Sequence, residues 1–128
     1  MERIHIKHTK VLGLLFVALL ILFPGTAIAA EWYEGGNLHE ATISEWKKAT
    51  PENKLATCGD FIAALFQHEQ LNLPITTVES IKPYAQELVS FIDLATEEDE
   101  DESFNEYIDS QTVQSFVISG VLMMGWTE

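Results

Sequence analysis

The first thirty residues constrain the fold most, because their pattern is that of a segment removed before the rest of the chain folds. A basic stretch over residues 1–10 precedes an apolar run over 11–23. This order is typical of a secretory signal peptide. A bilayer span needs about 20 apolar residues, and Pro24-Gly25 ends this run early. The pattern therefore favours removal over membrane anchoring.

The cleavage position is predicted from the small residues that follow the apolar run. Ala27 and Ala29 form an A-x-A pattern that predicts cleavage after Ala29, and cleavage after Ala30 is a close alternative. We therefore predict a signal peptide over residues 1–29, a single domain over 30–128, and a periplasmic or secreted location.

The predicted mature chain is strongly acidic. Without residues 1–29 it keeps four of seven basic and 19 of 20 acidic residues, which gives a net charge of −15. The four basic residues are Lys47, Lys48, Lys54 and Lys82. Such a chain repels phosphate backbones and anionic lipid surfaces. We expect no nucleic-acid partner and no stable membrane anchor.

The mature length and the single cysteine, Cys58, limit how the domain is stabilised. A chain of about 100 residues buries enough surface for one core. No internal disulfide is possible, so packing must hold the fold. We expect Cys58 to be a buried thiol that packs as a small apolar side chain. The alternative is a disulfide to a second copy, which would make a homodimer.

Apolar residues recur at helical spacing along the mature chain, and alternating strand patterns are absent. We predict an all-α fold, a small bundle of four or five helices after the cleaved signal peptide. The expected helices run from about 43 to 49, from 51 to near 71, from 81 to 95, and from 103 to 126 in one or two pieces.

Helix-start signals set these boundaries. Thr42 has Glu45 three residues on, which is a capping box, and Thr50 precedes a proline that suits a first turn. Ser80 is the expected cap of the third helix, because Pro83 then falls in its first turn. Ser103 is the expected cap of the last segment.

The last helix is apolar on nearly every side, which predicts a central, buried element. Gly125-Trp126 predicts a helix stop with the indole folded back onto the bundle. The six consecutive acidic residues over 97–102 repel one another and are expected in a solvated loop.

No motif predicts catalysis, a metal or a cofactor. His68-Glu69 begins an H-E-x-x-H pattern, but position 72 is Asn72. An EF-hand loop starting at Asp99 would need glycine and glutamate at its sixth and twelfth places, where this chain has other residues. Cys58 has no histidine one helical turn away. We therefore predict a protein that is not an enzyme.

Aromatic residues are the candidate partner-binding residues. Trp32 and Tyr33 precede Gly35-Gly36, which permits a sharp turn, so this arm either plugs a groove on the bundle or anchors a partner. Trp46, on the first helix, is the third candidate.

Two short segments carry a resemblance to known protein groups. The arm from Trp32 to Gly36, followed by a helix with Trp46, resembles small exported bacterial helical proteins with a Trp-Tyr-x-Gly-Gly arm, a group that implies no activity. The segment Thr57-Cys58-Gly59-Asp60-Phe61 is similar to HdeA-type acid-stress chaperones, which carry a disulfide. Periplasmic immunity proteins of type VI secretion toxins share the leader and small helical body, generally with cysteine pairs.

These features predict a non-enzymatic exported protein that binds another protein, in the context of envelope or acid stress. Below about pH 4 most carboxylates become protonated and the net charge turns positive, which would loosen the bundle. The alternative is an immunity or inhibitor protein whose negative surface binds a basic enzyme or toxin.

Overall fold

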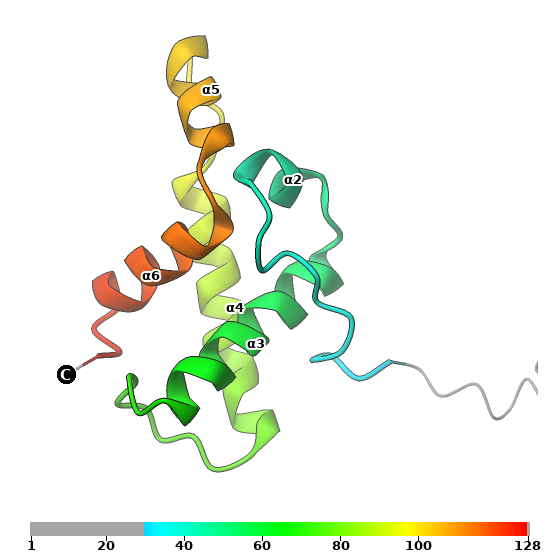
Figure 1. The fold of residues 1–128 in the computed structure, drawn as a ribbon, viewed down its shortest axis with the longest axis vertical. Coiled ribbons are helices and arrows are strands. Elements are labelled where there is room, and N and C mark those ends of the chain that lie inside the picture. The colour runs from blue at the N-terminus through cyan, green and yellow to red at the C-terminus, as the bar shows by residue number, and fades with distance from the viewer. Residues whose placement is uncertain (1–29, 128) are drawn as a thin grey trace, which may run out of the picture. The chain divides into compact units, whose positions relative to one another are not determined.

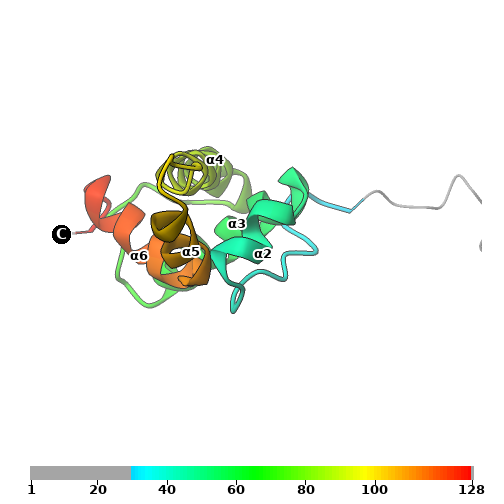
Figure 2. The same ribbon diagram turned by 90° about the horizontal axis from the view of Figure 1, so that it is seen from above.

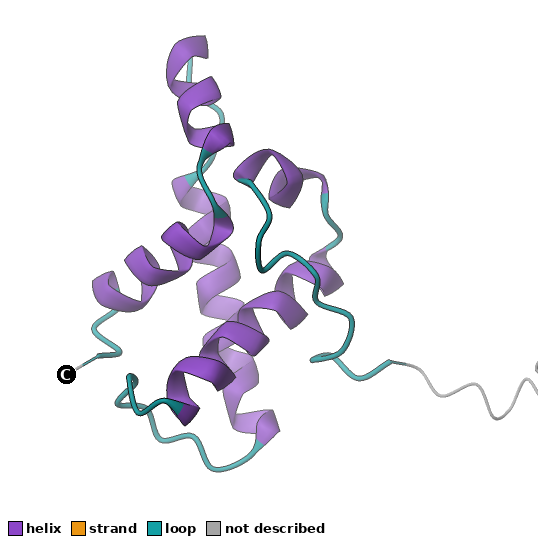
Figure 3. Ribbon diagram, in the orientation of Figure 1, coloured by secondary structure: helices purple, strands orange, loops and turns teal. Residues whose placement is uncertain are grey.

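A computed structural model describes residues 30–127, and the predicted signal peptide lies outside these residues. The described part holds five α-helices and no strand (Figure 3). The helices are α2 (Ile43–Lys48), α3 (Pro51–Gln67), α4 (Val78–Ala95), α5 (Glu102–Ser110) and α6 (Val113–Met123). The prediction of an all-α bundle of four or five helices is confirmed.

The two longest helices, α3 and α4, cross each other and form the frame of the bundle (Figure 1). α6 packs against α4, and α2 lies beside α5 near the end of α4 (Figure 2). The core joins these layers through fully buried side chains from four helices, Trp46, Ile62, Leu88 and Val117.

A glycine allows α6 to approach α4 closely. A Cβ atom on Gly120 would lie 2.8 Å from Cδ2 of Phe91 and 2.9 Å from Cδ1 of Leu88. Both distances are shorter than van der Waals contact. The missing side chain of Gly120 therefore sets how near the two helices can pack.

The starts of α2 and α6 are paired through their backbones. Thr42 and Thr112, the N-cap residues of the two helices, form an isolated antiparallel bridge. The Ile43 N–H donates to the Gln111 carbonyl at 2.8 Å, and the Val113 N–H donates to the Ala41 carbonyl at 2.9 Å. Each pairing satisfies an N–H that a helix start leaves without a partner.

Two predicted helix starts are confirmed. The Thr42 hydroxyl accepts from the Glu45 N–H, and the Glu45 carboxylate accepts from the Thr42 N–H, which completes the capping box. The Thr50 hydroxyl accepts from the Asn53 N–H at 3.2 Å, with Pro51 as the first residue of α3.

α4 begins three residues earlier than predicted. Thr77, not Ser80, is its N-cap, and Ser80 is the third residue of a capping box, where its hydroxyl accepts from the Thr77 N–H. Pro83 therefore lies inside the helix, where it cannot donate to the carbonyl of Glu79. The reciprocal bonds of Thr77 and Ser80 hold the first turn in spite of that loss.

α3 ends four residues before the predicted Leu71. Glu69 adopts the left-handed conformation, with φ of 59°. The Gln70 N–H donates to the Leu65 carbonyl, and the Glu69 N–H donates to the Phe66 carbonyl. These two bonds form a Schellman motif, which usually has glycine at the left-handed position.

The acidic run is a loop, as predicted, up to the residue that starts α5. Asp101, not Ser103, is the N-cap of α5, and its carboxylate accepts from the N–H groups of Ser103 and Phe104. The hydrogen bonds from the Ser103 hydroxyl and from both N–H groups lower the pKa of Asp101 below its usual range. The ionised carboxylate is the better acceptor at a helix start.

The predicted helix stop at Gly125 and the folded-back indole are observed, although α6 ends at Met123 and not at residue 126. Gly125 has φ of 70°, and the Trp126 N–H donates to the Val121 carbonyl at 3.2 Å. The indole of Trp126 is buried and packs edge-on against Tyr84 of α4, with ring centroids 5.4 Å apart.

Candidate functional site

The two aromatic residues of the arm take different positions. Trp32 packs on Gly59 of α3, where a Cβ atom would lie 2.8 Å from its ring, and its Nε1 donates to Glu79 of α4 at 3.1 Å. Tyr33 packs edge-on against Trp32 and is 39% exposed. Trp32 therefore bridges α3 and α4, whereas Tyr33 leaves part of its ring accessible to a partner.

The chain that follows these aromatics is fixed along α3. Gly36 approaches the helix so closely that a Cβ atom would lie 2.6 Å from the Thr57 nitrogen. The Asn37 N–H donates to Asn53 Oδ1 at 3.0 Å, and the Leu38 N–H donates to Thr57 Oγ1 at 3.2 Å. The arm is therefore part of the packed structure.

Trp46 lies in the core and has no exposed surface. Its Nε1 donates to Asp93 Oδ1 of α4 at 2.8 Å. Lys54 Nζ donates to the same oxygen at 3.1 Å and lies 5.3 Å from the centre of the indole ring. A partner could not touch Trp46 without opening the core, so the structure gives this predicted partner-binding residue a packing role.

Cys58 is a buried thiol, as expected, with no exposed surface. Burial, and to a smaller extent the negative charge of Asp93, raise the pKa of Cys58 far above its usual range. A nucleophilic cysteine has the opposite environment, exposed and near positive charge. A disulfide to a second copy would also require the core to open.

The two histidines of the described part lie on different parts of its surface. His39 Nε2 lies 2.8 Å from Asp60 Oδ2, and both side chains are about 40% exposed. His68 is the exposed C-cap residue of α3. Over residues 30–127, no group of three His, Cys, Asp or Glu side chains is arranged to hold a metal ion.

The acidic loop is held on one side by a lysine and a buried asparagine. Lys47 Nζ donates to Glu98 and to Asp109, each at 2.7 Å. Asn105 accepts from the Asp99 N–H and donates to the Asp99 carbonyl, both at 2.8 Å. These bonds fix the loop to α2 and α5, so its other carboxylates are presented from an ordered backbone.

The outer face of α6 is exposed, which corrects the prediction that this helix is a central, buried element. Ile118 is 43% exposed, Leu122 is 60% exposed and Met123 is 76% exposed. We call these three residues the α6 face. α6 carries no charged residue over its length, and its other exposed residues are the uncharged Gln114, Ser115 and Ser119. The α6 face therefore places three large apolar side chains on an uncharged surface of an otherwise acidic protein.

A small apolar hollow adjoins the α6 face. It has a volume of about 220 Å³, and α6 contributes Ile118, Val121 and Leu122 to its wall. Leu65 from α3 and Leu71 from the following loop complete the apolar lining. An inserted apolar side chain would touch two helices at once.

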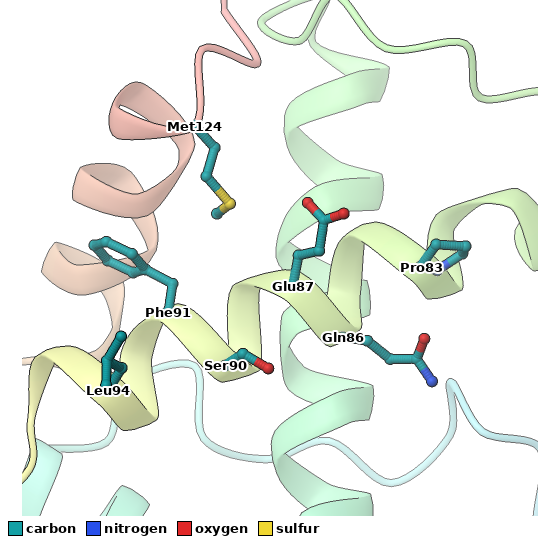
Figure 4. Close-up of a pocket in the computed structure, with 7 residues that line it drawn as sticks. All are labelled: Pro83, Gln86, Glu87, Ser90, Phe91, Leu94 and Met124. Atoms are coloured by element: carbon teal, nitrogen blue, oxygen red, sulfur yellow. The ribbon is translucent and has the colours of Figure 1, made fainter.

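A larger, more open groove lies between α4 and the end of α6, with a volume of about 560 Å³. We call it the α4–α6 groove. Figure 4 shows Met124 pointing toward α4, from which Glu87 and Phe91 project toward it. Leu94 lies at one end of the groove and Pro83 at the other (Figure 4), and Leu94 is 69% exposed. The two hollows share no lining residue, because α6 itself lines the smaller one and only Met124, just after α6, lines the groove.

The exposure of the α6 face and of Leu94 was not predicted from the sequence. The signal was present, because α6 is apolar on more sides than an 11-residue helix can bury against one neighbour. Apolar content alone does not show which side a neighbour covers.

Comparison of the chain with protein-family models, with curated proteins and with solved structures found no match in any of the three. Among the described helices, none is both long enough and apolar enough to span a membrane.

Proposed function

We propose that this chain is a non-enzymatic exported protein that acts by binding another protein through the α6 face. The observation that carries the proposal is the exposure of Ile118, Leu122 and Met123 on a helix without charge. Large apolar side chains gathered on the surface of a small soluble domain mark interaction sites.

The energy available at this surface is enough to matter for binding. Complete burial of a leucine or methionine side chain contributes about 1.5–3 kcal/mol. Because Leu122 and Met123 are 60% and 76% exposed, a partner that covers both gains roughly 2–4 kcal/mol before the cost of association. The adjoining hollow adds a place for an apolar anchor of the partner.

The export part of the proposal rests on the sequence of residues 1–29, which supports a periplasmic or secreted location. In that setting the protein would bind its partner in the envelope or outside the cell, in the context of envelope or acid stress. The resemblance of the Trp32-to-Gly36 arm to small exported proteins supports the same location.

The experiment is affinity capture from an envelope extract with the parent chain and two matched variants. Leu122→Ser removes an anchor from the α6 face, and Val78→Ser removes a comparably exposed apolar side chain at the start of α4, where Val78 is 47% exposed. We expect the parent and Val78→Ser to capture the same protein and Leu122→Ser to lose it. Equal capture by all three would contradict the proposal.

The second candidate function is inhibition of a basic enzyme or toxin, as an immunity protein would act. It is favoured by the charge of −15 over residues 30–128 and by the pairing of two of the four lysines, Lys47 and Lys54, with carboxylates. Capture that disappears at high salt and yields one basic enzyme supports inhibition. Capture of many unfolded proteins at acid pH supports a stress role.

A further inference from the structure

The α4–α6 groove has an apolar wall with one charged residue in it. Phe91 and Leu94 on α4 and Met124 after α6 supply the apolar surface. Glu87 is the only charged side chain that lines the groove. From Pro83 to Leu94 the groove follows twelve residues of α4, a length of about 16 Å or three helical turns. This length fits a partner helix of three to four turns.

The negative charge continues beyond one end of the groove. Leu94 lies near the C-terminal end of α4, and the acidic run begins at Glu97. Lys47 pairs with Glu98 of this run and with Asp109 of α5, and the run is exposed along its whole length. A ligand lying in the groove therefore meets the Glu87 carboxylate beside its apolar contacts and further carboxylates beyond the C-terminal end of α4.

We infer that the α4–α6 groove binds a cationic amphipathic helix of the partner protein. This inference rests on the proposed function and names the chemistry of the partner. Apolar side chains at i, i+3 or i+4, and i+7 of that helix cover Phe91, Leu94 and Met124, in the manner of helix-in-groove recognition. Its lysine or arginine side chains pair with Glu87 and with the exposed carboxylates of the acidic run.

A second copy of this chain is the less suitable occupant. Each copy carries a charge of −15 over residues 30–128, and like charges brought together at an interface oppose association. A basic helix gains from the same field.

The test measures binding of three labelled 14-residue peptides by fluorescence anisotropy at about 0.15 M salt, where surface charges are screened beyond about 8 Å. The assay uses the chain in the form in which it is purified from the cells that express it. The first peptide has leucines at helical spacing and lysines elsewhere, the second has glutamates in place of the lysines, and the third is a scramble of the first. We expect the first to bind at least tenfold more tightly than the other two.

Variants of groove residues test whether the peptide binds in the α4–α6 groove. Leu94→Ser and Glu87→Lys should each weaken binding of the first peptide about tenfold or more, and Val78→Ser should leave it unchanged. The three side chains are exposed, so these variants should fold, which circular dichroism checks. Equal binding of the scrambled or glutamate peptide, or parent-like binding by Leu94→Ser and Glu87→Lys, would overturn the inference.

Two further outcomes separate this inference from the proposed function. If Leu94→Ser and Glu87→Lys bind the first peptide as the parent does while Leu122→Ser still loses the captured protein, the groove is not the site and the α6 face remains one. If sedimentation shows a dimer that Leu94→Ser dissociates, a second copy occupies the groove and the inference is wrong.

Discussion

Asp93 is the residue whose replacement tests the packing of the core most sharply. Its Oδ1 accepts both from Trp46 Nε1 at 2.8 Å and from Lys54 Nζ at 3.1 Å. Trp46 is fully buried, so Asp93→Ala leaves its N–H without an acceptor. An unpaired buried donor costs about 1–3 kcal/mol, and loss of a partly exposed ion pair adds up to about 1 kcal/mol.

We therefore expect Asp93→Ala to lower the free energy of unfolding by about 2–3 kcal/mol. For a domain of this size this corresponds to a fall in Tm of about 10–20 °C. The matched control is Asp93→Asn, which keeps an acceptor oxygen for Trp46 and loses only the charge. We expect the control to lose about 1 kcal/mol or less.

The assay is urea unfolding followed by circular dichroism, with the m-value compared between variants to confirm that each unfolds in the same way. A loss below about 0.5 kcal/mol for Asp93→Ala, or an equal loss for both variants, would refute the view that the Trp46 hydrogen bond holds α2 on α4.

Three other predictions concern the backbone and pH. Glu69→Gly should raise the free energy of unfolding by about 1 kcal/mol, because glycine adopts the left-handed conformation without a Cβ penalty; urea unfolding measures it, and a decrease would contradict the role of φ at 59°. Gly120→Ala should lower the free energy of unfolding by about 1–3 kcal/mol by crowding Phe91 and Leu88, and a Tm equal to the parent's would show that α6 shifts freely. Acidification to about pH 3 should change the tryptophan emission and increase apolar-dye binding; if both signals stay constant, the acid-stress version of the function is wrong.

Lys47 determines how stability responds to high pH, in contrast to the carboxylates, which respond to low pH. Burial lowers the pKa of Lys47, but the hydrogen bonds and charges of Asp109 and Glu98 together raise it by more than burial lowers it. The net pKa therefore lies above the usual 10.5. A raised pKa means that the contribution of Lys47 to stability is complete below about pH 10 and is lost as the pH rises through the folded-state pKa. The acid response therefore comes from the carboxylates, and Lys47 keeps its charge throughout it.

Local signals predicted the parts of the fold that local chemistry decides. Thr42 and Thr50 start helices because their hydroxyl groups cap N–H groups three residues away, within one turn. The stop at Gly125 likewise depends on one residue with positive φ. In such cases both partners of the interaction lie within a few residues of each other in the sequence.

Other boundaries depend on choices that the sequence leaves open. Ser80 can act as a cap or as the third residue of a box begun by Thr77, and the structure selects the second arrangement. Glu69 gives no sign of its left-handed conformation, because glutamate is an ordinary helix residue. The bonds of the Schellman motif outweigh its conformational cost.

The candidate site was least predictable, because it depends on which surfaces remain uncovered. Trp46 and Leu122 are both large and apolar, yet one is fully buried and the other 60% exposed. The difference arises from long-range contacts. Trp46 is held on α4 by its hydrogen bond to Asp93, whereas α6 packs mainly against α4 and leaves Leu122 uncovered.

The central claim, that the α6 face binds another protein, is tested most directly by photo-crosslinking in the producing cell. A photoreactive amino acid replaces Leu122 in one full-length chain and Val78 in another, since both side chains are exposed. We predict a discrete crosslinked product with a second protein from position 122 and none from position 78. No product from position 122, or the same products from both positions, would contradict the claim.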